Sequence, residues 1–183
     1  MKKALKIIGI ALLILISIPL ISAIFVKKEY AVEREVTIMA PKQVVFNYIK
    51  HLKNQDNYSV WSSMDPQMKK EYKGTDGNVG FISAWESDKK EVGKGEQEIL
   101  KINEGERIDF ELRFYEPFES TDHAYMMTDQ VSEAQTRVKW GFNGKFKYPM
   151  NFMLLFMDME EMLAKDLETG LLNLKELLED PNV

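Results

Sequence analysis

The sequence predicts an α+β domain in which an antiparallel sheet of about six to seven strands curves around a long C-terminal helix. Two observations carry this prediction: segments of alternating polar and apolar residues with short turns between them, and a final amphipathic stretch of helical period. A third observation, an apolar run near the N-terminus, adds a transmembrane helix. We therefore divide the chain into a membrane anchor, residues 1–28, and one domain, residues 29–183.

The N-terminal run is long enough to cross a bilayer. Residues 7–26 are 20 consecutive uncharged positions, the length that spans the hydrocarbon core. Lysines flank both ends, and the larger group at the first end favours a cytoplasmic N-terminus and an exported domain, so we expect a single-pass membrane protein. The alternative is a cleaved signal peptide, which would give a secreted protein. Ala23 is small enough for cleavage, but Ile21 occupies the position where a second small residue is expected.

The charge of the chain is divided unevenly. Five lysines and no acidic residue lie in residues 1–28, which leaves the remainder with 19 basic and 29 acidic residues, a net charge of −10. Because nucleic-acid binding depends on neutralising phosphates, we expect no nucleic-acid partner. Repulsion from anionic lipid also disfavours a domain that lies flat on a membrane. The sequence has no cysteine, which excludes disulfides, thiolate metal sites and cysteine nucleophiles.

The predicted domain opens with one strand and two short helices. Residues 30–38 alternate apolar and polar side chains, which indicates a half-buried strand. Pro41 then begins a helix, in which apolar residues recur at helical spacing as far as Leu52. Residues 58–64 are expected to form a short helix or turn, with Trp61 pointing inward.

Segments of period two follow, separated by short turns. Turns of this length join neighbouring antiparallel strands, so we expect the segments to form one sheet. The predicted strands cover residues 68–72, 79–87, 96–103, 107–116, 119–131 and 135–144.

Residues 151–178 are predicted to form one continuous helix about 42 Å long. Large apolar side chains recur along it in steps of three and four, which places them on one face. An apolar stripe of this width is unstable in water, so we expect the sheet to cover it. The stripe consists of Phe152, Phe156, Met159, Leu163, Leu167, Leu171, Leu174 and Leu178.

Several short motifs stand in a fixed order along the domain. They are Ile38-Met39-Ala40-Pro41 with Val44, Phe46, Tyr48 and Ile49, then Trp61, then Trp85 before Val92-Gly93-Lys94-Gly95-Glu96, and last Gly141-Phe142. With these motifs, about residues 29–179 resemble the START-related superfamily called SRPBCC, which includes polyketide cyclases and aromatase-like proteins. The resemblance implies a helix-grip fold, with a cavity for hydrophobic small molecules or lipids between the sheet and the long helix.

Aromatic and methionine side chains between the predicted sheet and helix are the candidate ligand contacts. Pockets for small molecules are lined mostly by apolar and aromatic groups, and the flexible methionine side chain suits an irregular cavity. The same residues would also fill a solid core, and the sequence leaves that alternative open for each of them. The candidates are Tyr58, Trp61, Trp85, Phe110, Tyr125, Trp140, Phe142, Met153, Phe156, Met157 and Glu160.

No group of residues in the sequence indicates catalysis, a metal site or a cofactor. His51 is expected at the surface near the end of a helix and His123 in a loop, and neither has a catalytic partner nearby in the sequence. Arg113 alternates with apolar neighbours, which favours the outer face of the sheet. Gly93 and Gly95 lack the third glycine of a dinucleotide-binding loop.

We therefore predict a membrane-anchored binding module for a hydrophobic small molecule or lipid. The first alternative is an enzyme of the cyclase, hydratase or hydrolase kind, which requires a polar residue with a perturbed pKa inside the cavity. The candidates for that residue are His51, His123, Asp109, Arg113 and Glu160. The second alternative is a scaffold domain with a filled core and an exposed apolar patch.

Overall fold

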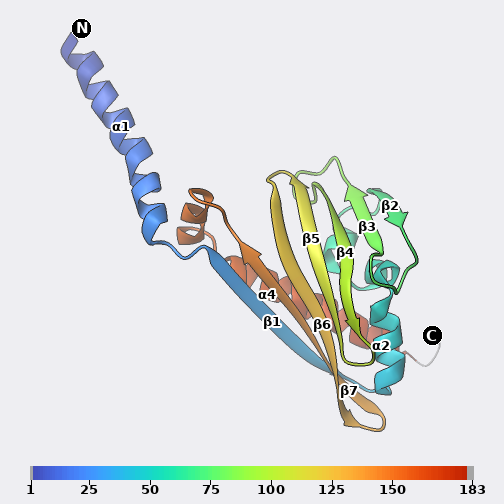
Figure 1. Cartoon of the computed structure of the whole chain (residues 1–183). Coiled ribbons are helices and arrows are strands. Elements are labelled where there is room, and N and C mark those ends of the chain that lie inside the picture. Colours follow the sequence, from blue (N-terminus) through green and yellow to red (C-terminus); the bar gives the residue numbers. More distant parts are fainter. Residues whose placement is uncertain (1, 181–183) are drawn as a thin grey trace.

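A seven-stranded sheet forms the body of the domain, and a separate helix, α1 (Lys2–Phe25), extends away from it (Figure 1). The computed structural model describes residues 2–180, so residue 1 of the predicted anchor and residues 181–183 of the predicted domain lie outside the described range. The strands pair in the order β1-β7-β6-β5-β4-β3-β2. They are β1 (Glu29–Ile38), β2 (Lys69–Lys73), β3 (Ile82–Glu86), β4 (Lys94–Asn103), β5 (Arg107–Glu116), β6 (Ser120–Ser132) and β7 (Gln135–Lys145).

Each pair of neighbouring strands in this order is antiparallel. From β2 to β7 the strands that follow one another in the sequence also lie side by side, as short turns predict. The first strand pairs with the last one, which places Val32 opposite Phe142 and Ile38 opposite Thr136. The predicted α+β arrangement, an antiparallel sheet with a long C-terminal helix packed on it, is confirmed.

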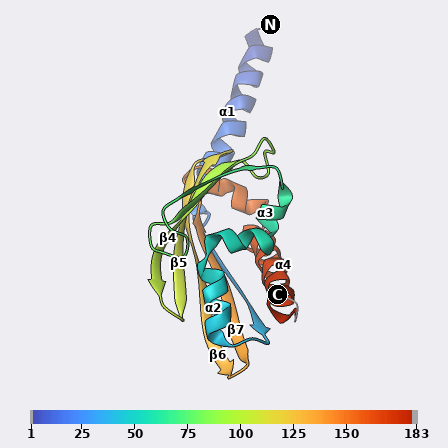
Figure 2. The same cartoon turned by 90° about the vertical axis from the view of Figure 1, so that its right-hand side faces the viewer.

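The helices of the domain lie in two parts of the chain. α2 (Lys42–Lys50), the 3-10 helix η1 (Leu52–Asn57) and α3 (Val60–Met64) connect β1 to β2, and the 3-10 helix η2 (Met150–Leu155) and α4 (Met159–Glu179) follow β7. Figure 2 shows α2, α3 and α4 together on one side of the sheet. Their apolar residues join those of the strands in one hydrophobic core.

The apolar stripe of α4 packs mainly on β1 and also on β7. Its buried residues stand at steps of three and four: Ala164, Leu167, Gly170, Leu171 and Leu174. A Cβ at Gly170 would lie 2.9 Å from the ring of Trp140. Glycine at this position therefore lets the Trp140 ring pack directly beneath the helix.

The predicted continuous helix over residues 151–178 is wrong, because the chain turns between η2 and α4. The Asp158 side chain accepts a hydrogen bond of 2.9 Å from the backbone N–H of Glu161, which starts α4 at Met159. Asn151 in η2 is buried and donates to backbone carbonyls at the end of α1. As a result Phe156, predicted on the stripe that faces the sheet, is 74% exposed.

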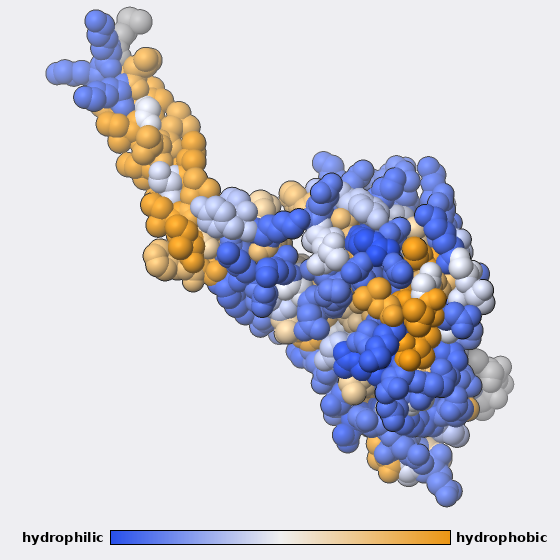
Figure 3. Space-filling model, in the orientation of Figure 1, coloured by the Kyte–Doolittle hydropathy of each residue, from blue (hydrophilic) through white to orange (hydrophobic). Residues whose placement is uncertain are grey.

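Among the described residues, α1 is the helix that is long and apolar enough to cross a membrane. Its apolar side chains are almost all exposed, and Ala23 at its C-terminal end is the buried exception. Figure 3 shows the apolar surface of α1 reaching from its basic first residues to the domain.

We predict that Leu171→Ala lowers the free energy of unfolding by about 2–5 kcal/mol, because it removes buried methyl groups from the contact between α4 and the sheet. Leu171 is 1% exposed, whereas the adjacent Leu172 is 48% exposed, so Leu172→Ala is the matched control and should change stability by less than about 1 kcal/mol. Urea unfolding of the full chain in detergent micelles measures both. Equal losses for the two variants would contradict this account of α4.

Candidate ligand-binding cavity

A cavity of about 540 Å³ lies between the inner face of the sheet and the helices that pack on it. Its floor comes mainly from β3 to β7, with Tyr30 of β1 and Lys70 of β2 at its margins, and its other walls come from η1, α3 and α4. The loop that follows β5 and the segment that follows β7 line one end. A volume of this size is within the usual range for small-molecule sites in proteins.

Aromatic rings from the sheet and from α3 form much of the wall. Trp61 meets Trp140 edge-on, with 5.9 Å between ring centroids, and Trp85 meets Phe114 in the same way at 5.8 Å. Phe142 lines the cavity beside Trp140 on β7. Edge-to-face pairs of this kind hold rings in fixed orientations, so the wall is formed before a ligand arrives.

The Val-Gly-Lys-Gly stretch holds Trp85 in the wall. The indole Nε1 of Trp85 donates to the carbonyl oxygen of Val92 at 3.3 Å. Gly95 pairs with Trp85 across the sheet, and a Cβ at Gly95 would lie 2.6 Å from the indole ring. The second glycine of this stretch is therefore needed because the tryptophan occupies the space that a side chain would take.

α4 contributes the apolar wall that faces the sheet. Met159, Leu163 and Leu167 line the cavity at steps of four, the spacing of one helix face. These three belong to the stripe that the sequence predicts, although it did not separate them from the residues that pack on β1. Leu171 and Leu174, further along the same stripe, lie in the core instead.

Polar and charged side chains also line the cavity, and Gln55 is the most unusual of them. Its side chain is 9% exposed, and its Nε2 is buried without a hydrogen-bond partner among the described residues. An unpaired buried amide costs about 1–3 kcal/mol, so a ligand atom that accepted this hydrogen bond would recover that cost. Nothing in the sequence indicates this role, because Gln55 lies between the two predicted helices, in a segment without apolar periodicity.

Asp122 is the buried carboxylate of the cavity wall. Its two oxygens accept hydrogen bonds from the backbone N–H of Lys145 at 3.0 Å and from Ser120 Oγ at 2.9 Å. Burial raises the pKa of the Asp122 carboxyl, against the effect of these two hydrogen bonds. Period two along β6 could have identified it, because Asp122 shares a sheet face with buried Ala124 and Met126.

Four of the eleven candidate ligand residues line the cavity: Trp61, Trp85, Trp140 and Phe142. Tyr58 and Phe110 are buried in the core outside the lining, and Tyr125 lies on the outer face with its hydroxyl donating to Glu33. Met153, Phe156 and Met157 lie in η2 or just after it. Glu160 pairs with Lys27 at 2.7 Å, beside the end of α1.

The five candidates for a catalytic polar residue all lie outside this cavity. His51 is at the surface with its Nδ1 3.6 Å from Asp76 Oδ2, and Asp109 pairs with Arg107 at 2.7 Å. His123 is exposed within β6, so its predicted placement in a loop is wrong. Within residues 2–180, no three or more acidic or histidine side chains gather as metal ligands.

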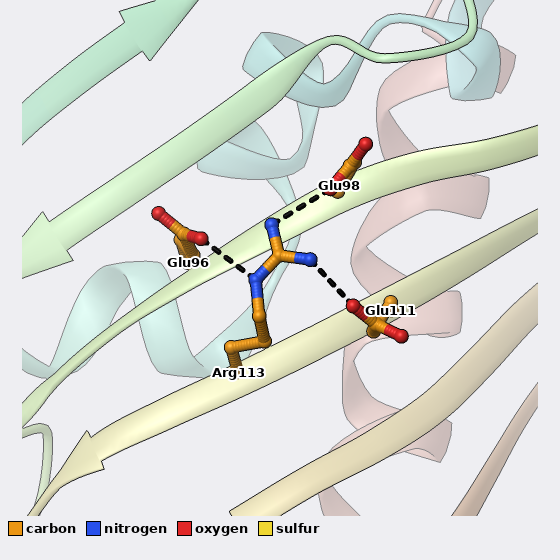
Figure 4. Close-up of polar contacts among 4 residues, drawn as sticks. All are labelled: Glu96, Glu98, Glu111 and Arg113. Carbon is orange, nitrogen blue, oxygen red and sulfur yellow. Dashed lines mark hydrogen bonds and ion pairs between the residues drawn. The ribbon is translucent and has the colours of Figure 1, made fainter.

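Arg113 lies on the outer face of the sheet, as predicted, where it binds three glutamates (Figure 4). Its guanidinium is 2.7 Å from Glu96 and 2.7 Å from Glu98 on β4, and it also contacts Glu111 on β5. Each of these side chains is only about a quarter exposed or less. The cluster is a structural link between two strands rather than part of the cavity.

The profile of the family described as "Polyketide cyclase / dehydrase and lipid transport" matches residues 30–179. The chain belongs to this family. The match covers the whole domain from β1 to the last turn of α4 and leaves α1 outside. The predicted relationship to the SRPBCC superfamily is confirmed, and with it membership of a family that binds hydrophobic ligands.

Solved structures share the fold of this polyketide cyclase family member at low sequence identity. Truncated norcoclaurine synthase from Thalictrum flavum aligns with a TM-score of 0.62 at 11% identity, over 83% of this chain and 94% of that one. Protein MLL2253 from Mesorhizobium loti gives 0.59 at 13% identity, over 84% and 100%. The Aha1 dimer from Colwellia psychrerythraea gives 0.57 at 12% identity, over 84% and 99%. No curated protein matches the sequence.

We predict that the stability of the wild-type protein relative to Asp122→Asn falls as pH rises above about 4. Because the pKa of Asp122 is raised in the folded state, the folded protein binds a proton at higher pH than the unfolded chain, whose aspartates titrate near about 3.9. The resulting stability is present at low pH and is lost as pH rises through the folded-state pKa.

Urea unfolding at a series of pH values measures this dependence. Asp129→Asn, at an exposed position of the same strand and outside the cavity, makes the same change and is the control. A pH-independent difference for Asp122→Asn would show that burial does not disfavour its charge.

Proposed function

We propose that the chain is a membrane-anchored binding protein for a hydrophobic small molecule or lipid. The observation that carries the proposal is the cavity, whose lining surface is mostly apolar and comes largely from aromatic rings and aliphatic side chains, with polar groups that include the unpaired amide of Gln55. Such a wall favours an apolar ligand that carries a hydrogen-bond acceptor at one point. Trp61, Trp85, Trp140 and Phe142 are its proposed contacts on the side of the sheet and α3.

The remaining sequence candidates have supporting places in this proposal. Tyr58 packs edge-on against Trp140 at 5.7 Å between ring centroids and so fixes the cavity wall from behind. Phe110 fills the core beneath the sheet. Met153, Met157 and Glu160 belong to the junction with α1. The sheet and α4 would grip the ligand between them, as in a helix-grip fold.

The proposed anchor is α1, which would remain attached rather than be cleaved. Tyr148 donates its hydroxyl hydrogen to the carbonyl oxygen of Leu20 at 3.2 Å, and Asn151 donates to that of Ala23 at 2.7 Å. Both acceptors lie in the last turns of α1, where a signal peptide would be cut. The lysine distribution favours a single-pass protein with residues 29–183 on the exported side, and a secreted form after cleavage is the alternative.

One observation favours the enzyme alternative of the cyclase, hydratase or hydrolase kind. Asp122 is a buried acid with a raised pKa at the cavity wall, which is the property that a general acid requires. Its two oxygens are already occupied by Lys145 N–H and Ser120 Oγ, which suits a structural carboxylate better. If the protein is an enzyme, Asp122→Asn abolishes turnover of a hydrophobic substrate and leaves its binding intact.

The three tryptophans of the chain all line the cavity, so tryptophan fluorescence reports its occupancy. We predict saturable quenching when the full chain in lipid nanodiscs is titrated with a fatty alcohol whose chain is dibrominated. Ala124→Phe places a ring in the cavity and should weaken binding at least about tenfold, or about 1.4 kcal/mol.

Ala134→Phe makes the same change at the exposed turn between β6 and β7 and should bind as the wild type does. Far-ultraviolet circular dichroism establishes that both variants are folded. Quenching that does not saturate, or that is equal in the two variants, would count against the binding function.

Gln55→Leu should change ligand binding and stability in opposite directions. Removing the unpaired amide should leave the free protein as stable or more stable, because no buried donor is left without a partner. The variant should weaken the binding of the brominated alcohol about threefold to tenfold and leave the binding of the matching brominated alkane unchanged. Gln67→Leu, at an exposed position, is the control. An equal loss of affinity for alcohol and alkane would mean that Gln55 makes no hydrogen bond to the ligand.

A further inference from the structure

The end of α1 is joined to the domain by direct contacts. Asn151 is buried, and its Nδ2 donates to the carbonyl oxygens of Ala23 at 2.7 Å and Val26 at 3.0 Å. The backbone N–H of Phe146 donates to the carbonyl oxygen of Lys28 at 2.9 Å. Together with the bond from Tyr148 to α1 and the ion pair of Glu160, these contacts fix the direction in which α1 leaves the domain.

One end of the cavity lies on the same side of the domain as the C-terminal end of α1. The cavity is lined there by Val92 before β4, by residues 116–120 between β5 and β6, and by residues 145–147 with Met150 after β7. Both views show these connections at the end of the sheet next to the C-terminal end of α1 (Figures 1 and 2). The turn between β6 and β7 lies at the opposite end.

Large apolar side chains are exposed along this end. Phe118 lines the cavity and is also 62% exposed, and Met150 combines the same two properties. Tyr148, Leu155 and Phe156 are exposed in the segment that contacts α1. We call these five residues the apolar rim. Lys147 directly precedes Tyr148 of the rim, and Lys27 and Lys28 follow shortly after Phe25, the last residue of the proposed membrane helix.

We propose that the apolar rim sits in the interfacial layer of the bilayer that α1 spans, and that the cavity takes its ligand directly from the lipid phase. This inference rests on the proposed function. Transfer of phenylalanine, tyrosine and leucine side chains into the interfacial layer is favourable, and Lys28 and Lys147, which are not paired with Glu160, can bind lipid phosphates. The fixed exit of α1 holds the rim at the level where the helix enters the membrane.

The acidic character of the domain agrees with this arrangement. Its net charge of −10 disfavours broad contact with anionic lipid, and the rim is an end of the domain rather than one of its faces. A ligand that passes from bilayer to cavity also avoids exposing its apolar surface to water, which is unfavourable.

Depth measurements test where the rim lies. Since the chain has no cysteine, Phe118→Cys, Phe156→Cys and Ala134→Cys each provide a single labelling site. With a bimane label on the full chain in phosphatidylcholine vesicles, doxyl-labelled lipid should quench positions 118 and 156 at least about twice as strongly as position 134. Equal quenching at the three positions would overturn the proposal.

The rate at which the cavity takes up ligand tests whether the ligand enters directly from the lipid phase. The brominated alcohol is presented within vesicles, and quenching of the tryptophans is followed with time. Leu155→Asp together with Phe156→Asp changes rim residues that do not line the cavity, and it should slow loading at least about threefold without changing final occupancy. The control is Leu172→Asp, at an exposed position of α4.

The two proposals fail differently in this experiment. A wild-type protein that never shows saturable quenching would refute the binding function itself. A protein that loads normally, but at the same rate in the rim variant and with an unquenched rim, would keep the binding function and refute the membrane route.

Discussion

Most of the architecture depends on where α4 sits on the sheet. Its apolar stripe packs over β1 and β7, at one edge, with Trp140 beneath Gly170. Within residues 2–180, the main strand contacts of α4 are with β1 and β7, and the inner face of β3, β4 and β5 faces η1 and the short α3 across the cavity. The cavity occupies the space that remains. The placement of α4 on the sheet therefore determines both which part of the core is filled and where the cavity lies.

On their inner face, strands β4 and β5 border the cavity. On their outer face, ion pairs join the two strands. Leu112 and Phe114 of β5 point into the cavity, while Glu111 and Arg113 alternate with them on the outside. There Arg113 joins β5 to β4 through Glu96 and Glu98. Half-buried ion pairs in a network hold strands together more effectively than isolated surface pairs, which contribute about 0–1 kcal/mol each.

Sequence periodicity was sufficient for the strands and for the pairing of neighbours from β2 to β7, because the two-residue alternation and the short turns are local signals. It did not predict that β1 pairs with β7, since that contact joins distant parts of the chain. It failed where a distant contact decided the outcome: Asn151 reaches the end of α1, and the Asp158 cap starts a new helix seven residues later. The site was predictable only in part. Trp85 and Phe110 look alike in the sequence, yet one lines the cavity and the other fills the core, because that choice depends on where α4 leaves space. Gln55 carries no periodic signal at all.

Residues 145–151, from the end of β7 into η2, have two structural roles. Residues 145–147 and Met150 line the cavity. Tyr148 and Asn151 donate hydrogen bonds to α1, and the backbone of Phe146 donates to Lys28 just after α1. The tilt of a membrane helix follows the thickness of its bilayer. If α1 spans a bilayer as proposed, a change in its tilt would displace residues 145–151 and with them part of the cavity wall, so the thickness of the bilayer would influence the pocket.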